Sequence, residues 1–490
     1  MPTTRIIAPA FDFSAIGDEL GLSVDFPSYA LAEAEAALAA VTAAQDVPPT
    51  DPVWATVPWA DRDDATGLAL VSLDQAGARE IDQAFQVERT SAGFLLHVAV
   101  SDVAALVTPG GSLDTEARRR GQSVPLPGGS VPLHPAVLTE RAASLLPDLL
   151  RPAVLWRIEL DDDAQVVDSS VRRAVVRSVG SFSYDEVQRS VDGSAELHPS
   201  LAALPELGRL RQSAARDRGV IALRQPEQEV RELPGEHRWQ LSVRRRSDVD
   251  DWKAELALLV GACAAAMMLE VGTGILRVVP EPAATTVARL RARARALGVT
   301  WPLEAPVGEV LANLDQAAPT TLVLERAAGA LLAGATYAAF DGEPPAATTH
   351  YGLGVPYANV TAPLRRVVDR YATEVCLAAS QGQPVPEWVR EVLLSLPAVM
   401  DSSDAVVRQV DDSCVDLTTA TVLASRVGES FPAVAVRSAD EEEHGEVFIE
   451  QPPRLAACTG LLDPGTHVTA VLTTADPATR SVVFAQAEPV

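Results

Sequence analysis

The spacing of apolar residues changes twice along the chain. Around residues 68–107, short runs of β-branched and aromatic residues are bounded by turn residues, which is the pattern of half-buried strands. Residues 200–400 are instead rich in alanine and leucine at helical spacing. There we predict long helices at 254–271, 284–297, 322–339 and 365–380. The pattern therefore predicts an α+β protein whose middle region contains long helices.

The pattern changes again after Asp401, where short apolar runs alternate with turns. Five such runs are strand candidates: 420–428, 431–438, 446–451, 467–475 and 480–487. Five short antiparallel strands are typical of an OB-type β-barrel. We therefore predict a C-terminal five-stranded OB-type barrel over residues 401–490.

The first 60 residues form a third region. They contain one arginine and eight acidic residues, with an alanine-rich helix expected at about 29–44 and a linker at Val47-Pro48-Pro49. The predicted organisation is an acidic N-terminal region with helix and linker (1–60), a mixed domain (61–400) and the barrel (401–490).

Composition limits the class of protein. Hydrophobic residues make up 47% of the chain, and the longest apolar run, 256–269, is too short to cross a membrane. The four cysteines lie far apart, so we expect free thiols and a cytoplasmic location. A net charge of −26 argues against a nucleic-acid partner in general, yet arginines cluster locally. Of 40 basic residues only Lys253 is a lysine, and arginine is the better bidentate ligand for phosphate.

Candidate chemistry is concentrated in residues 73–84. Asp74, Glu80 and Asp82 flank a turn at Gly77, and a turn brings its flanking side chains together. Converging carboxylates repel one another unless a cation is present, and Mg²⁺ prefers oxygen ligands that it shares with substrate phosphates. The spacing alone leaves two interpretations open, a magnesium site or a polar hairpin tip.

This segment resembles the signature of the ribonuclease II family, whose catalytic domain is called RNB. The resemblance continues in order from residue 62 to about residue 380. Its quoted matches are H97-V-A-V-S-D, L113-D-T-E-A-R-R-R-G, V131-P-L-H-P, A143-S-L-L-P, S181-F-S-Y, D217-R-G-V-I-A-L, K253-A-E-L, G274-I-L-R-V and H350-Y-G-L-G-V-P-Y-A-N-V-T-A-P-L-R-R-V-V-D. So many ordered matches are unlikely to arise by chance.

The resemblance implies a Mg²⁺-dependent exoribonuclease that digests single-stranded RNA from its 3′ end and releases nucleoside 5′-monophosphates. One or two Mg²⁺ ions are expected, with Mn²⁺ as a substitute, in a monomer without a membrane partner or small-molecule cofactor. The resemblance assigns metal binding to Asp74, Glu80 and Asp82, catalysis to Asp82, Glu80 and Arg365, and substrate binding to Tyr184, Glu255, Arg366 and Gln83. Arg366 has a structural role as its alternative.

The chain also departs from the family pattern. Gln83 replaces the second aspartate of the family's D-x-D-D, and Glu80 replaces another aspartate. Pro125 and Leu223 stand where the family stacks bases on aromatic side chains, and residues 1–60 lack the family's usual cold-shock-type barrels. Two other functions therefore stay open. One is a catalytically weak relative that holds RNA without cutting it, and the other is a magnesium phosphohydrolase of smaller substrates.

Overall fold

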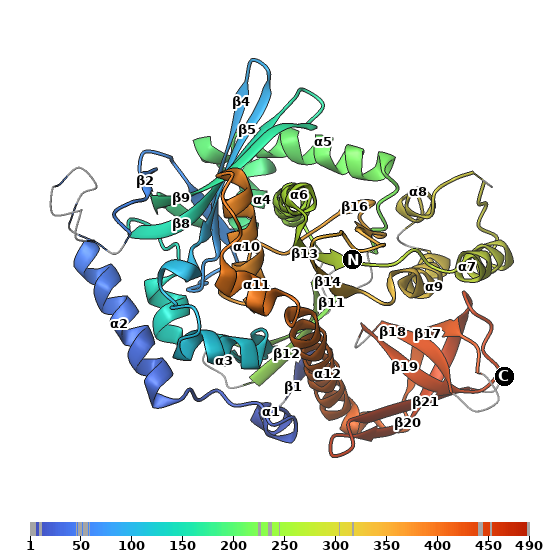
Figure 1. Ribbon diagram of the computed structural model, residues 1–490. Helices are drawn as coiled ribbons and strands as arrows, with labels where there is room; N and C mark the ends of the chain where they lie inside the picture. The colour runs from blue at the N-terminus through green and yellow to red at the C-terminus, as the bar shows by residue number, and fades with distance from the viewer. Residues whose placement is uncertain are drawn as a thin grey trace.

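The computed structural model contains a seven-stranded sheet, drawn at the upper left of Figure 1. The structure describes residues 6–8, 12–45, 47, 51, 57, 59–223, 227–233, 238–244, 246–302, 304–315, 318–439, 444–450 and 453–487. The predicted linker at Val47-Pro48-Pro49 lies mostly outside these residues.

The sheet has two parallel pairs at its edges and antiparallel pairs elsewhere. Its strands in spatial order are β10 (Gly180–Ser183), β3 (Val71–Asp74), β4 (Gln83–Thr90), β5 (Gly93–Ser101), β8 (Leu150–Leu160), β9 (Val166–Arg177) and β2 (Asp63–Asp64). Strands β5 and β8 are buried almost throughout, because one large and one smaller apolar cluster lie on their two faces. The strands predicted around residues 68–107 are confirmed as β3 and β5.

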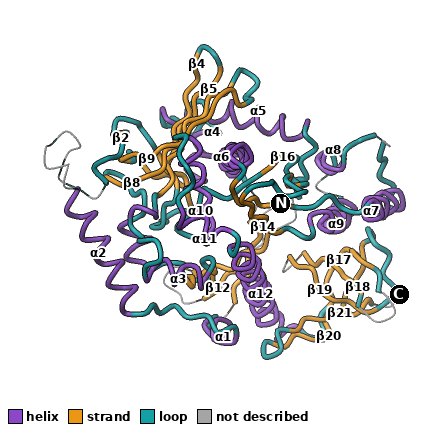
Figure 2. The backbone as a smooth tube through the Cα atoms, viewed as in Figure 1, coloured by secondary structure: helices purple, strands orange, loops and turns teal. Residues whose placement is uncertain are grey.

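Three helices supply most of the large cluster on one face: α5 (Leu204–Asp217), α6 (Asp248–Val271) and α10 (Val367–Ser380). Helix α6 begins with a capping box between Ser247 and Asp250 and ends at Gly272, whose φ of 69° is left-handed. By length and composition α6 could cross a membrane. Here, however, it packs against α5 and α10 inside the protein (Figure 2).

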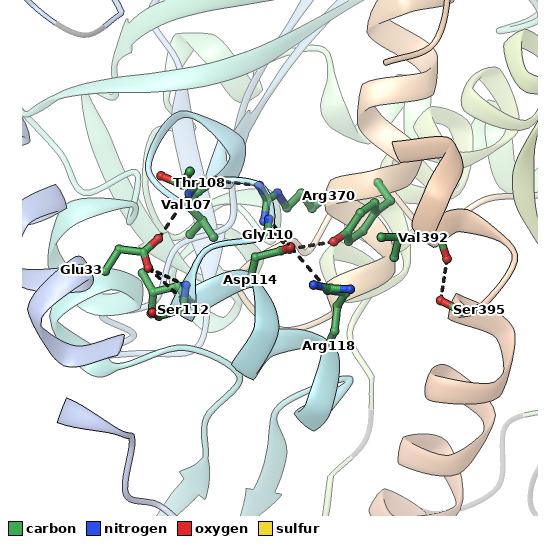
Figure 3. A network of polar contacts seen from close by, with 12 residues as sticks. Glu33, Val107, Thr108, Gly110, Ser112, Asp114, Arg118, Arg370, Val392 and Ser395 are labelled. Carbon is green, nitrogen blue, oxygen red and sulfur yellow. Dashed lines mark hydrogen bonds and ion pairs between the residues drawn. The ribbon is translucent and has the colours of Figure 1, made fainter. Parts of the chain in front are cut away.

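The N-terminal helix α2 (Ser28–Ala44), predicted at 29–44, lies against α3 (Ser112–Arg120). Glu33 of α2 accepts hydrogen bonds from the backbone N–H groups of Ser112 and Leu113, at 2.9 and 3.1 Å, and so caps α3. Asp114 of α3 in turn accepts from Arg370 of α10 at 2.7 Å (Figure 3). The acidic N-terminal region is therefore tied through α3 to the helices of the core.

Residues 6–393 contain further helices and strands. They are β1 (Ile6–Ala8), α1 (Ser14–Glu19), β6 (Val124–Leu126), β7 (Gly129–Val131), α4 (Tyr184–Val191), β11 (Glu227–Leu233), β12 (Arg238–Arg244), β13 (Thr273–Val278), α7 (Ala284–Ala296), α8 (Val307–Ala312), α9 (Pro319–Ala328), β14 (Thr336–Asp341), β15 (Thr349–His350), β16 (Val355–Pro356) and α11 (Glu387–Leu393). Short helical turns lie at 103–105, 138–142, 199–201 and 329–332. The helices predicted at 254–271, 284–297 and 365–380 are confirmed. The one predicted at 322–339 is wrong beyond residue 332, because Thr336–Asp341 pairs with β13 as a strand.

A closed barrel of five strands lies at the C-terminus, and its spatial order is β17 (Ser430–Arg437), β18 (Gly445–Glu450), β19 (Pro453–Thr459), β21 (Ser481–Gln486) and β20 (His467–Asp476). The predicted barrel is confirmed, with β19 and β21 parallel rather than antiparallel.

One of the five predicted barrel strands is wrong. Residues 420–428 form the end of helix α12 (Leu396–Leu423) and the short turn Ala424–Arg426, because Ala420 and Leu423 bury a helical face against the barrel. The strand that the pattern missed is β19. The boundary predicted at residue 401 also falls inside α12, whose Leu396 and Met400 belong to the large apolar cluster formed with the sheet and with α5, α6 and α10.

Candidate active site

The loop between β3 and β4 carries the three predicted carboxylates. Gly77 turns it with a φ of 79°, and the Ala78 N–H donates to the Gln75 carbonyl at 3.0 Å. Ser144 holds the next residues, since its Oγ donates to the Arg79 carbonyl at 2.7 Å and accepts from the Ile81 N–H at 3.0 Å. The loop therefore has a fixed conformation before any ligand binds.

Asp82 joins this loop to a second one more than 280 residues away in the sequence. Its Oδ1 accepts from the Leu364 N–H at 2.9 Å and its Oδ2 accepts from Arg365 Nε at 2.8 Å. The Asp82 side chain is only 4% exposed, whereas that of Arg365 is 51% exposed. Asp82 raises the pKa of Arg365, so this guanidinium stays a cation at the surface of the site. The structure thus brings together two residues that the sequence assigned to catalysis.

The second loop is itself held in place. The Ser123 N–H donates to the Arg365 carbonyl at 2.9 Å, and Asp369 accepts from the Ala362 N–H at 2.7 Å. Asp369 also accepts from Nε and Nη2 of Arg366, at 2.9 and 2.8 Å. These contacts support the structural alternative for Arg366, because two of its donors are already used inside the protein.

Asp74 and Glu80 complete the group of carboxylates. Burial, with the nearby charge of Asp82, raises the pKa of Glu80 to about 7. Burial also raises the pKa of Asp74, while Lys253 and Arg365 oppose that rise. Buried carboxylates with raised pKa values are common at functional sites. The polar hairpin tip is therefore the poorer interpretation, because these side chains are largely withdrawn from water.

Glu80 also lines a cavity of about 590 Å³. Residues 24–26 of the N-terminal region form part of its wall, together with Thr139 and the turn around Gly129. Arg120 fixes this wall, because its guanidinium lies 3.8 Å from the centre of the Phe26 ring and donates to the backbone carbonyls of Ser23 and Asp25. The acidic region thus borders the site.

Tyr184 lies at the sheet edge that carries Asp74, whereas Glu255 lines a different cavity. Ser183 pairs with Asp74 in the parallel β10–β3 ladder, so Tyr184, the next residue, lies at the same edge of the sheet. Glu255 lies on α6 and lines a separate cavity of about 310 Å³ together with Arg211 and Arg218. Its Oε2 is 4.0 Å from Arg211 Nε, and neither of these two atoms has a hydrogen-bond partner among the described residues.

Three departures from the family pattern have different environments. Gln83 is 8% exposed and is the first residue of β4. Pro125 is exposed on the β6–β7 hairpin. Leu223 packs at the edge of a small apolar cluster around Leu290 and Leu324. Neither Pro125 nor Leu223 offers an aromatic face.

The donor set suits a hard cation such as Mg²⁺. Within the described parts of the chain no three His, Cys, Asp or Glu side chains lie close enough together to hold an ion by themselves. Magnesium usually takes only one or two carboxylates and completes its coordination with waters and substrate phosphates. The residues present therefore fit an ion that binds with the substrate rather than in a cage made by the protein.

Sequence reasoning gave no role to three residues that shape this site: Lys253, Ser144 and Asp369. All three lie inside the motifs quoted above, so the signal was present. Ser144 acts on a loop 63 residues before it, which no local pattern shows. Asp369 acts on residues 362–366, just before it in the sequence. The charge of Lys253 opposes the rise in the pKa of Asp74.

The fold and the site agree with a nuclease domain of the RNB type followed by a small closed barrel. The RNB domain matches residues 62–379, and the RNase II-type exonuclease C-terminal S1 domain matches residues 429–487. The chain belongs to the RNB family of ribonuclease II and ribonuclease R, as the motifs predicted.

Similar proteins include exoribonucleases from bacteria and plants. The exosome complex exonuclease RRP44 homolog A of Arabidopsis thaliana is 29% identical over 337 residues, 66% of this chain and 36% of that protein. Ribonuclease R of Escherichia coli is 27% identical over 341 residues, 66% of this chain and 41% of that protein. The chain thus spans about two fifths of the length of these relatives or less.

Solved structures share the fold. Apo RNase R of Mycoplasma genitalium has a TM-score of 0.84 at 18% identity, covering 97% of this chain and 77% of that one. Yeast Ssd1, described as a pseudonuclease, has a TM-score of 0.66 at 17% identity, covering 81% of this chain and 50% of that one. The same fold therefore occurs in nucleases and in a protein described as a pseudonuclease.

Proposed function

We propose that this chain is a Mg²⁺-dependent 3′ to 5′ exoribonuclease that hydrolyses single-stranded RNA to nucleoside 5′-monophosphates in the cytoplasm. The observation that carries the proposal is the arrangement around Asp82, which binds Arg365 Nε and the Leu364 N–H beside Asp74 and Glu80. The four cysteines are free, in keeping with a reducing compartment.

Four residues of the site can each contribute to phosphodiester hydrolysis. A bound divalent cation supplies charge neutralisation at the scissile phosphate and lowers the pKa of a water. Asp82 and Asp74 offer carboxylate oxygens for such an ion. Arg365 donates to Asp82 through its Nε. Its two terminal amino groups can therefore bind non-bridging phosphate oxygens bidentately. Glu80, with a pKa of about 7, can exchange a proton near neutral pH.

RNA is the proposed substrate because of the relatives and the site. Ribonuclease R of Mycoplasma genitalium has been solved with ribose-methylated single-stranded RNA and with double-stranded RNA. In this chain we assign the terminal nucleotide to the region of Tyr184 and Glu255. Glu255 there has an oxygen without a hydrogen-bond partner, which can accept from a ribose 2′-hydroxyl.

A catalytically weak RNA-binding protein is the second candidate. Gln83 in place of an aspartate favours it, as do Pro125 and Leu223 in place of stacking aromatics. We prefer the enzyme, because a protein that only binds RNA has no need of a buried Asp82 and a half-buried Asp74 and Glu80 beside an exposed arginine.

End-labelled single-stranded RNA with and without Mg²⁺ distinguishes these functions. We expect labelled mononucleotide to accumulate with Mg²⁺ when the 3′ end carries the label, and a ladder of shortened products when the 5′ end does. A gel shift without cleavage would support the binding protein. Turnover confined to short oligonucleotides or nucleotides would support a phosphohydrolase of smaller substrates.

A further inference from the structure

The cavity beside Glu80 is lined by two parts of the chain that lie far apart in the sequence. One part comprises residues between 129 and 140, and the other comprises residues between 24 and 31 of the acidic N-terminal region. The cavity volume of about 590 Å³ falls in the usual range of small-ligand sites, roughly 300–1,000 Å³. Because Glu80 belongs both to this lining and to the carboxylate site, the cavity adjoins that site.

Phe26 supplies an aromatic ring to the cavity lining. The guanidinium of Arg120 lies 3.8 Å from the centre of this ring, and the Arg120 side chain is itself only 6% exposed. Glu116 accepts from Arg120 at 2.7 Å and so keeps the guanidinium in place. Arg120 is not a lining residue, so the ring presents a different side to the cavity. The structure therefore holds the Phe26 ring in position before any ligand binds.

The segment that carries Phe26 is also anchored. It leads directly into α2, where Glu33 accepts from the backbone N–H groups of Ser112 and Leu113 at the start of α3 (Figure 3). On the other side of the cavity, Pro125 pairs with the lining residue Ser130 in the β6–β7 hairpin and offers no aromatic face. Phe26 thus gives the cavity a stacking surface that the hairpin does not provide at residue 125.

The charges of the lining indicate which part of a nucleotide fits. Its ionisable side chains, Asp25, Glu80 and Glu140, are all acidic. Carboxylates repel a phosphate group, but they accept hydrogen bonds from the exocyclic amino group of a base such as cytosine. The remaining lining is largely apolar and includes Val24 and Leu31. Apolar walls, one aromatic ring and several acceptors suit a nucleobase with an amino group.

We propose that this cavity binds one base of the RNA substrate, which stacks on Phe26 and donates its amino group to the acidic lining. The base belongs to the nucleotide on the 5′ side of the scissile phosphate, since we assign the terminal nucleotide to the region of Tyr184 and Glu255. This inference rests on the proposed function, because it assumes that RNA reaches Glu80. It gives the N-terminal region a part in substrate recognition.

RNA binding by Phe26 variants tests the stacking contact. The affinity of short uridine oligomers with a penultimate cytosine is measured by fluorescence anisotropy in EDTA. Phe26→Leu should weaken binding by roughly 5-fold or more, because one stacked base contributes about 1–3 kcal/mol, whereas Phe26→Tyr should bind as the wild type does. Tyr29→Leu is the matched control. It removes a ring from the same segment that is 64% exposed and does not line the cavity.

The identity of the base gives a second readout. Changing only the penultimate base of the oligomer from uracil to cytosine should tighten binding to the wild type by about 2- to 12-fold, the net contribution of one hydrogen bond. The same change at the 5′ end should have no effect. Equal affinity for the two penultimate bases would remove the amino-group contact from the proposal.

The other outcomes separate this inference from the proposed function. Equal RNA affinities of the wild type and a folded Phe26→Leu protein, or an equal loss in Tyr29→Leu, would overturn the role of Phe26. If Phe26→Leu weakened binding of free cytidine 5′-monophosphate but not of RNA, the cavity would hold the released product, and the inference would be wrong. RNA cleavage by the wild type would leave the proposed function standing in each case. A wild type that neither binds nor cleaves RNA would contradict both.

Crosslinking on the unmutated chain covers the case in which Phe26→Leu does not fold. RNA with 5-iodocytidine at the penultimate position is irradiated in the complex, and the crosslinked peptide is sequenced by mass spectrometry. We expect the crosslink at Phe26, because the base stacks on that ring. Crosslinks confined to residues outside the cavity lining would overturn the placement of the base.

Discussion

Asp82 is the residue on which the two loops of the site meet. Replacing Asp82 by Asn keeps an oxygen for the Leu364 N–H and removes the negative charge that would bind metal and orient Arg365. We expect Mg²⁺-dependent cleavage to fall by roughly 100-fold or more, the scale of losing one preorganised electrostatic contact. We expect the free energy of unfolding to change by less than about 2 kcal/mol, because Arg365 is half exposed and needs no partner to stay solvated.

The measurement is single-turnover cleavage of labelled RNA, with urea denaturation of the same preparations. Wild-type rates in a folded Asp82→Asn protein would remove Asp82 from the metal site.

Glu80 makes the stability of the metal-free protein depend on pH. Its pKa is raised from an ordinary value of 4.5 to about 7, chiefly by burial. A carboxyl with a raised pKa favours folding most below its unfolded pKa, and that contribution is lost as pH rises through the folded value. In EDTA, the free energy of unfolding of the wild type should therefore fall by on the order of 2–3 kcal/mol between pH 4.5 and pH 7.5. The free energy of unfolding of Glu80→Gln should not show this fall.

Urea denaturation of both proteins at several pH values gives this difference. Mg²⁺ at pH 7.5 should restore part of the loss in the wild type, because a bound cation favours the ionised carboxylate. Parallel stability curves for the two proteins in EDTA would show that Glu80 is not the group responsible.

At the scale of elements, the close packing of α5 on α6 decides where Lys253 and Glu255 lie. Gly208 of α5 touches Trp252 of α6 so closely that an added Cβ would come within 2.2 Å of the indole ring. Gly208→Ala should therefore lower the free energy of unfolding by about 1–3 kcal/mol and displace the start of α6. It should also weaken RNA cleavage, because Lys253 follows Trp252 directly.

Gly329→Ala is the matched control. It lies in a short helical turn, and an added Cβ there meets nothing within 4 Å. It should leave both stability and cleavage within experimental error of the wild type. Equal urea midpoints for the two variants would mean that the α5–α6 contact adjusts to the added methyl group without loss of stability.

The elements also show where pattern reasoning works. Helices α2, α7 and α10 could be predicted within one or two residues, because their apolar spacing and their turns are local properties. The sequence pattern predicts a strand at 420–428, because this segment is short, apolar and ends in glycine. It is helical because it continues α12, whose Thr418 and Ala420 are already buried, a tertiary reason that no local window contains.

At the scale of the whole molecule, the barrel contacts α12, α9 and, through the ion pair of Arg480 with Glu19, α1. Arg454 of the barrel bonds to Asp416 of α12, and Arg326 of α9 lies 3.2 Å from Glu446 of β18. Ser403 and Asp404, at the other end of α12, contact Gly121 and Gln122 beside the active-site loop. A cut at residue 401 would therefore damage the catalytic region, whereas a cut after Gly428 spares it.

Removing residues 429–490 should weaken capture of long RNA modestly and leave cleavage of short oligomers largely intact. Residues 440–443 are all acidic, and they lie outside the described residues. We therefore expect the barrel to contribute only modestly to the electrostatic attraction of RNA. Filter binding of a long RNA and single-turnover cleavage of a short oligomer test this together. A folded truncation that no longer cleaves short oligomers would show that the barrel helps to build the site.

The family, the α+β class, the barrel and the eight candidate site residues could be predicted from the sequence, because motifs and apolar periodicity are properties of short segments of the chain. Only the packing of the folded chain joins Asp82 to Arg365. The reason is physical. Charge compensation and burial depend on which loops meet in space, and Asp82 and Arg365 form their ion pair although 283 residues separate them in the sequence.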